Sequence, residues 1–157
     1  MSKLTEHLKG LWRRLMELEG TPHAVAGGVA IGIFFGFTPL FGFKTLLCLA
    51  ACAIFRLNPL AAVLSVTFHD IVTPLWPVIL RVEYEIGYWL LSNPHHFPPA
   101  MTFHEFKFTE LISWKNFRDI GGPLMLGGVL VALPFSAATY VGFYAFLASR
   151  QRRKQKS

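Results

Sequence analysis

The feature that most constrains this chain is a run of twenty-nine residues without a charged side chain, from Gly121 to Ser149. A second run, from Ala24 to Phe43, has twenty such residues. A helix needs about 20 apolar residues to cross the roughly 30 Å hydrocarbon core of a bilayer. A soluble domain of this size could not bury so much apolar surface in one core. We therefore expect an integral membrane protein.

The composition also indicates a membrane protein, and the absence of common catalytic motifs limits the functions to be expected. Hydrophobic residues make up 53% of the 157 residues and charged residues only 15%, whereas soluble chains have about 45–50% and 25%. No P-loop, GxSxG or dinucleotide-binding motif is present, so no enzymatic activity is expected. His95, His96 and His104 lack the spacing of zinc ligands. Neither a metal nor another cofactor is expected.

The C-terminal end of the chain is basic. Five of the fifteen Lys and Arg residues lie in the last eight positions, directly after the apolar run. A basic tail can bind nucleic acid, but beside a membrane segment it is more typical of a cytoplasmic anchor. Residues 1–20 are predicted to form an amphipathic helix in the membrane interface or, alternatively, an ordinary surface helix. Its apolar stripe consists of Leu4, Leu8, Leu11, Trp12, Leu15 and Leu18.

The first apolar run is interrupted in a way that indicates a hairpin. Pro39 lies between Gly36 and Gly42, and Lys44 follows at once. The next stretch, Thr45 to Phe55, has eleven residues and is too short to cross a bilayer. We expect a half-helix, a tight turn and a returning half-helix, which together form a re-entrant hairpin. A single helix kinked at Pro39 is the alternative.

The predicted class is all-α and membrane-embedded, with an interfacial helix and about four hydrophobic segments in one domain. Asn58-Pro59 begins a segment predicted from Leu60 to Leu80, and a fourth apolar run covers Ile86 to Leu91. The organisation is an interfacial helix at 1–20, a first membrane region at 22–92, an extramembrane loop at 93–122, a last membrane segment at 123–149 and a basic cytoplasmic tail at 150–157.

An internal repeat is suggested when the chain is shifted by one hundred residues. Seven identities occur in the positions from 27 to 49, either by chance or because two related hairpins are present, as in transporters built from duplicated halves. The identities pair Gly27, Gly28, Val29, Phe35, Gly42, Phe43 and Leu47 with Gly127, Gly128, Val129, Phe135, Gly142, Phe143 and Leu147.

Two groups of residues are candidates for function. Gly28, Gly32 and Gly36 form a ridge of small residues, on which another helix of this chain or of a second copy can pack. Lys44 and Asp70 are charges in apolar surroundings, where ionisable groups usually pair or bind a ligand. The candidate ligand-binding residues are Lys44, Asp70, His69 and Thr38, and the candidate hairpin and packing residues are Gly28, Gly32, Gly36, Pro39, Gly42, Asn58 and Pro59.

Residues 21 to 62 resemble a family of small bacterial multi-pass membrane proteins, domain of unknown function 2062. The matching positions are Pro22, His23, Gly28, Gly32, Gly36, Pro39, Gly42, Asn58 and Pro59. The resemblance continues through Pro74 and Gly87. His69-Asp70 departs from the pattern, since the family more often has an asparagine there. The resemblance implies a bacterial inner-membrane protein, and some members of the family are joined to glycosyltransferase domains.

Two functions are consistent with these features. The first is binding or translocation of a small solute or a lipid-linked anion at the hairpin, suggested by the broken helices and the buried charges. The second is a non-catalytic scaffold that anchors a protein partner in envelope biogenesis, suggested by the glycine ridge. Both termini are expected in the cytoplasm. The expected partners are membrane lipids, a second copy through the glycine ridge or another protein, and not nucleic acid.

Overall fold

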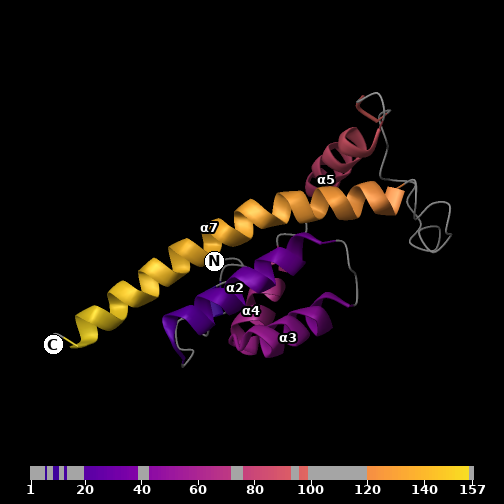
Figure 1. Cartoon of the computed structure of the whole chain (residues 1–157). Coiled ribbons are helices and arrows are strands. Elements are labelled where there is room, and N and C mark those ends of the chain that lie inside the picture. Colours follow the sequence, from indigo (N-terminus) through magenta and orange to yellow (C-terminus); the bar gives the residue numbers. More distant parts are fainter. Residues whose placement is uncertain are drawn as a thin grey trace.

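The computed structural model describes residues 6, 9–10, 13, 20–38, 43–71, 76–92, 96–98 and 120–155. Within these residues the protein consists of helices and contains no strand (Figure 1), which confirms the all-helical prediction for them. The helices are α2 (Pro22–Phe37), α3 (Lys44–Phe55), α4 (Pro59–Ile71), α5 (Trp76–Leu91) and α7 (Gly122–Gln155).

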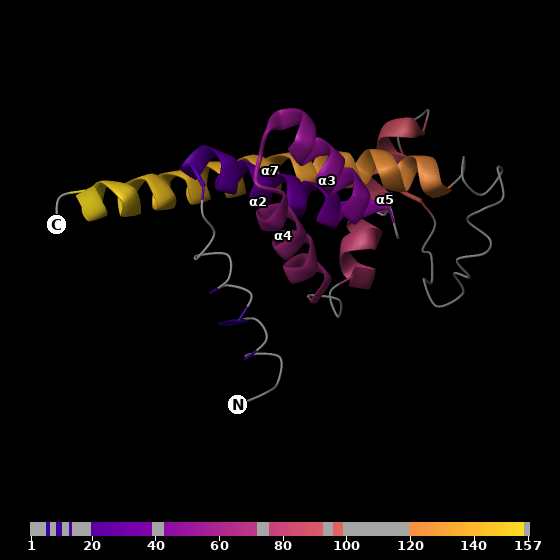
Figure 2. The ribbon, with the colours of Figure 1, turned by 90° about the horizontal axis from the view of Figure 1, so that it is seen from below.

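α7 is the long helix on which α2 and α5 pack. In both ribbon views α2 runs alongside α7 (Figures 1 and 2). The Nδ1 atom of His23 lies 2.8 Å from the hydroxyl of Tyr140, and the Ser136 hydroxyl donates to the Ala30 carbonyl at 2.9 Å. As the residue number increases along α2, the number of the contacted residue on α7 decreases, so the two helices are antiparallel.

Capping residues start α2 and α4. The Thr21 side chain accepts a hydrogen bond from the Ala24 amide, and the Asn58 side chain accepts one from the Ala61 amide. The proline after each cap occupies the first helical position, where its missing N–H costs nothing. The backbone N–H of Asn58 also donates to the Ala24 carbonyl at 2.9 Å. The predicted start of a segment at Asn58-Pro59 is thus confirmed, and its cap is attached to α2.

Glycines allow α2 and α4 to lie in direct contact. A Cβ atom at Gly28 would meet the Asn58 carbonyl oxygen, and one at Gly32 would meet the Ala62 carbonyl oxygen and, at 2.7 Å, the Ser65 Cβ. Both α2 and α4 advance in the same direction along this contact, so they are parallel. Two of the three ridge glycines are therefore covered by a helix of the same chain.

α2 and α3 are separate helices that pack on one another as a hairpin, not one helix kinked at Pro39. Cys48 and Cys52 are buried on the inner face of α3, where they pack against α4. The Cys48 thiol lies 4.0 Å from the Ile31 carbonyl. The turn itself, with Pro39 and Gly42, lies outside the described residues.

After Asn58 the helices of the structure differ from the predicted segments. The predicted segment from Leu60 to Leu80 is wrong, because α4 ends at Ile71 and the next helix begins at Trp76. The predicted run at Ile86 to Leu91 is only the end of α5. α5 crosses α7 (Figure 2), and a Cβ atom at Gly87 would meet the Pro123 backbone.

The two halves of the predicted repeat do not make equivalent contacts. Gly28 packs on α4, which runs parallel to α2. Gly127 packs on the Glu83 backbone and Pro123 on Gly87, so α5 and α7 run in opposite directions. Gly142 has no atom within 4 Å of an added Cβ. Residues 127–149 all lie within the single helix α7, whereas residues 27–49 extend from α2 into α3, so the second half does not form a hairpin like the first.

Much apolar surface is uncovered. Among the described residues, one helix, spanning Gly122–Arg153, is long and apolar enough to cross a membrane, and 22% of its most apolar window is buried. Pro22–Phe37, Lys44–Phe55 and Pro59–Phe68 are apolar but shorter. Exposed apolar side chains on α3 and α7 include Leu46, Leu49, Ile54, Phe55, Leu133, Phe135, Val141 and Phe146.

The ends of the chain are described only in part. Of residues 1–19, those described are Glu6, Gly10 and two basic residues, so the predicted interfacial helix lies mostly outside the described residues. The predicted loop at 93–122 also lies mostly outside them. The predicted tail at 150–157 does not begin as a separate segment, because α7 continues through Arg150 to Gln155.

Candidate functional site

The ends of three helices meet at one end of the α2–α3–α4 unit. Because α4 is parallel to α2 and α3 returns along them, the C-termini of α2 and α4 and the N-terminus of α3 lie at the same end. This end carries Thr38, which follows α2, and Lys44, which begins α3. It also carries positions 69 and 70 in the last turn of α4. All four predicted ligand-binding positions therefore belong to one region of the backbone.

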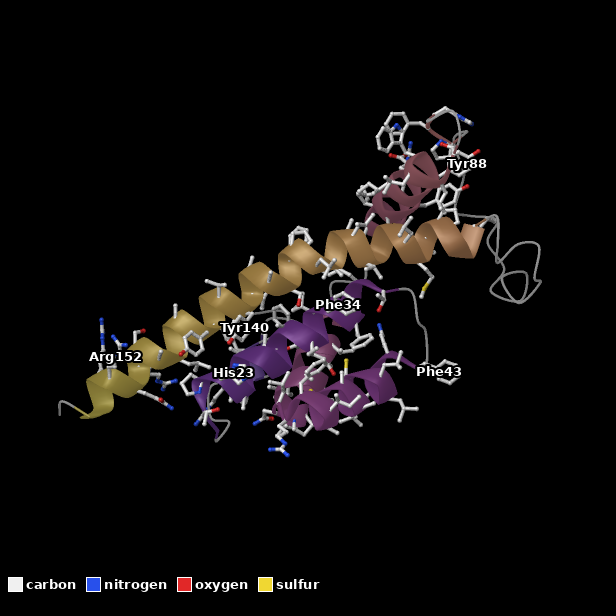
Figure 3. All side chains as sticks on the ribbon, viewed as in Figure 1. His23, Phe34, Phe43, Tyr88, Tyr140 and Arg152 are labelled. Carbon is white, nitrogen blue, oxygen red and sulfur yellow. The ribbon has the colours of Figure 1, made fainter. Side chains whose placement is uncertain are left out.

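Lys44 is a buried cation at the start of a helix. The residue is 9% exposed, although it is the first residue of α3. The preceding residue, Phe43, makes no side-chain cap and points away from the helices (Figure 3), and the first turn of α3 has no acidic residue. The amide groups at a helix N-terminus carry partial positive charge and favour anions. The Lys44 ammonium adds a full charge to that end.

Thr38 is also buried, with an exposed fraction of 4%. Its hydroxyl donates to the Phe35 carbonyl at 2.9 Å and so closes the last turn of α2. A hydroxyl oxygen retains acceptor capacity after it donates. Thr38 therefore has a structural role and remains a polar group close to the α2–α3 turn.

The register of the helices places position 70 near Lys44. Cys48 and Cys52 of α3 share a buried cluster with Ala62 and Val66 of α4. Residues four positions apart lie on the same face of a helix. Lys44 is four residues before Cys48 on α3, and position 70 is four residues after Val66 on α4. Both positions therefore lie one turn further along the same contact. The side chains of His69 and Asp70 lie outside the described residues. A Lys44–Asp70 pair therefore stays a prediction.

Glu83 is a candidate that the sequence interpretation missed. In the sequence it lies midway between Arg81 and Glu85, on the same helix α5. In the structure the Arg81 Nε donates to Glu85 at 2.8 Å on the exposed side of α5. Glu83 is 0% exposed, and neither of its carboxylate oxygens has a hydrogen-bond partner. The spacing of Arg81 and Glu85 was the available signal, since an i, i+4 pair on one helix face turns residue 83 away.

A polar pair joins the opposite end of the unit. His23 and Tyr140 face one another between α2 and α7 (Figure 3), with their rings in an edge-to-face arrangement at 5.9 Å. His23 was noted only as a family position. Since His23 is in the first turn of α2, the start of α2 lies beside the C-terminal half of α7.

No group of three or more His, Cys, Asp or Glu that could hold a metal occurs in the described part of the chain. No curated protein and no solved structure matches this chain. A family model described as an uncharacterised protein conserved in bacteria matches residues 5–156. Because this match extends over nearly the whole length, the chain belongs to that family, DUF2062.

Proposed function

We propose that the protein is embedded in the bacterial inner membrane and binds an anionic solute or lipid-linked anion at the end of the α2–α3 hairpin. The observation that carries the proposal is the buried Lys44 at the uncapped start of α3. An anion held there would be stabilised by the positive charge of Lys44 and by the amide groups of the helix N-terminus. Thr38 supplies a further polar group.

The membrane arrangement rests on helix length and direction. α7 is long enough to cross a bilayer, whereas α2, with 16 residues, and α3, with 12, are short for it. At their contacts α2 and α5 each run in the direction opposite to α7, and α4 is parallel to α2. In the proposed arrangement α4 and α5 together make one crossing, α7 makes the second, and the α2–α3 hairpin does not cross. Two crossings place both termini on the same side of the membrane. Their basic residues favour the cytoplasm.

The neighbourhood of His23 supports the same arrangement. Val25 near the start of α2 belongs to a cluster that includes Leu147 near the end of α7. The first helix and the last helix therefore have their outer ends at the same side of the bundle. Arg150, Arg152 and Arg153, which are exposed, continue α7 beyond that side, where they are suited to anionic lipid headgroups.

Binding and translocation are favoured over a scaffold role. In transporters, broken helices bring helix termini to an anionic substrate inside the bilayer, and the α2–α3 hairpin resembles such an arrangement at the level of fold. The glycine ridge was the main support for docking a partner or a second copy. Gly28 and Gly32 are covered by α4, so a partner on these two glycines would have to displace it.

Replacement of Lys44 by glutamine should weaken anion binding by about tenfold or more, because a charge-assisted hydrogen bond contributes about 1.5–3 kcal/mol. The full chain in detergent is titrated with inorganic phosphate and with farnesyl phosphate, and binding is measured by calorimetry. Arg56→Gln is the matched control, since Arg56 is an exposed cation at the other end of α3.

Tighter binding of farnesyl phosphate than of phosphate supports a lipid-linked anion, and equal binding supports a small solute. Thermal unfolding of Lys44→Gln close to that of the wild-type protein separates lost binding from lost folding. Unchanged affinity in Lys44→Gln, or the same loss in Arg56→Gln, would rule out the proposed site.

A further inference from the structure

The closest approach between α5 and α7 leaves no room for side chains. A Cβ atom at Gly87 would meet the Pro123 backbone, and one at Gly127 would meet the Glu83 backbone. Glu83 lies one turn before Gly87 and therefore on the same face of α5. Its carboxyl group is enclosed where the two helices cross.

The carboxyl group has no compensating partner. Glu83 is 0% exposed, and both of its side-chain oxygens lack a hydrogen-bond partner. An ionised carboxylate in such surroundings is far more costly than the neutral acid, because the charge loses its hydration without gaining a counter-charge. The folded state with packed helices therefore favours the protonated group.

Among the residues that the structure describes, the groups around Glu83 supply no counter-charge. On α5, Arg81 is paired with Glu85, and both are substantially exposed, at 59% and 36%. Tyr84 and Tyr88 are the other titratable groups nearby, and their rings pack on each other at 5.7 Å. α7 is the helix with extensive packing on α5, and its residues from 122 to 131 include no titratable side chain.

We propose that Glu83 is a proton-binding site at the α5–α7 crossing, and that loss of its proton separates the two helices at this point. Deprotonation breaks the carboxyl O–H bond, transfers the proton to water and leaves a carboxylate. That carboxylate must be hydrated, and Gly87 and Gly127 leave no space for water while the backbones are in contact. Opening of the crossing is the way in which water reaches it. This inference is independent of anion binding at Lys44.

The proton is observed directly by infrared spectroscopy of the full chain in detergent. We expect a C=O stretching band of a buried carboxylic acid at neutral pH, which disappears as the pH is raised. The band should be absent in Glu83→Gln and retained in Glu85→Gln, which removes an exposed carboxylate from the same helix. Absence of the band in the wild-type protein would overturn the proposal, as would its loss in Glu85→Gln.

The opening is followed by electron paramagnetic resonance with spin labels at Leu90 on α5 and Leu130 on α7, both exposed positions. Cys48 and Cys52 are replaced by alanine to remove competing thiols. The distance between the labels should change over the same pH range as the infrared band and remain constant in Glu83→Gln. A distance that does not change with pH, or that changes with Na⁺ concentration at constant pH, would contradict a proton-controlled crossing.

Discussion

Gly127→Ala should destabilise the protein by about 3 kcal/mol or more, which is at the upper end of the usual effect of overpacking. The added Cβ would meet the Glu83 carbonyl oxygen and carbon, and its Cα at 3.1 Å. These are backbone atoms of α5, so they can move only if the whole helix moves. Since native stability is typically about 5–15 kcal/mol, one methyl group would remove a large part of it.

Gly142→Ala is the matched control on the same helix. An added Cβ at Gly142 meets nothing within 4 Å, and alanine is favoured over glycine in a helix by about 0.5–1 kcal/mol. This substitution should leave thermal unfolding in detergent unchanged or raise the midpoint slightly. Equal midpoints for Gly127→Ala and Gly142→Ala would show that α5 and α7 are not in backbone contact.

The second large effect is expected at Gly28. In Gly28→Ala the new methyl group would meet the Asn58 carbonyl oxygen and, at 2.9 Å, the Ala61 Cβ. Asn58 also caps α4 and donates to the Ala24 carbonyl, so a shift of Asn58 weakens two contacts at once. We expect a loss of about 2–3 kcal/mol in the free energy of unfolding, with a lower yield of folded protein.

The neighbouring glycine tests the reason for this effect. The three atoms nearest to a Cβ atom at Gly27 would be side-chain carbons of Leu57, at 2.5–3.3 Å, and a leucine side chain can change rotamer. Gly27→Ala should therefore be clearly less destabilising than Gly28→Ala in the same thermal unfolding measurement. A larger effect at Gly27 than at Gly28 would mean that the ridge does not face α4.

Helix starts could be predicted from the sequence because their chemistry is local. Asn58 followed by proline is a capping pattern that needs no tertiary contact, and the structure has its helix start there. The break between α4 and α5 was missed because the apolar composition continues through it from Leu60 to Leu80. Pro77 in the first turn of α5 was the relevant signal, since proline is tolerated there but not in a helix interior.

The candidate site could be predicted only in part. The apolar run broken around Pro39 was sufficient to place Thr38 and Lys44 at one end of a hairpin. The role of Glu83 depends on which face of α5 meets α7, and this follows from backbone contacts of Glu83 with Gly127 and of Gly87 with Pro123, which are far apart in the sequence. The helix that covers the glycine ridge could not be identified either, because a small-residue ridge specifies close packing but not its partner.

Extraction of membranes with alkaline carbonate tests the central claim, that this helical bundle is integral to the bilayer. The buffer removes proteins held by charge or by an amphipathic surface helix, whereas it leaves proteins with buried helices in the membrane. We predict that the full chain stays in the pellet, because the proposed arrangement places the apolar helix α7 and the exposed apolar side chains of α3 in the lipid. Recovery of the protein in the supernatant would contradict the account.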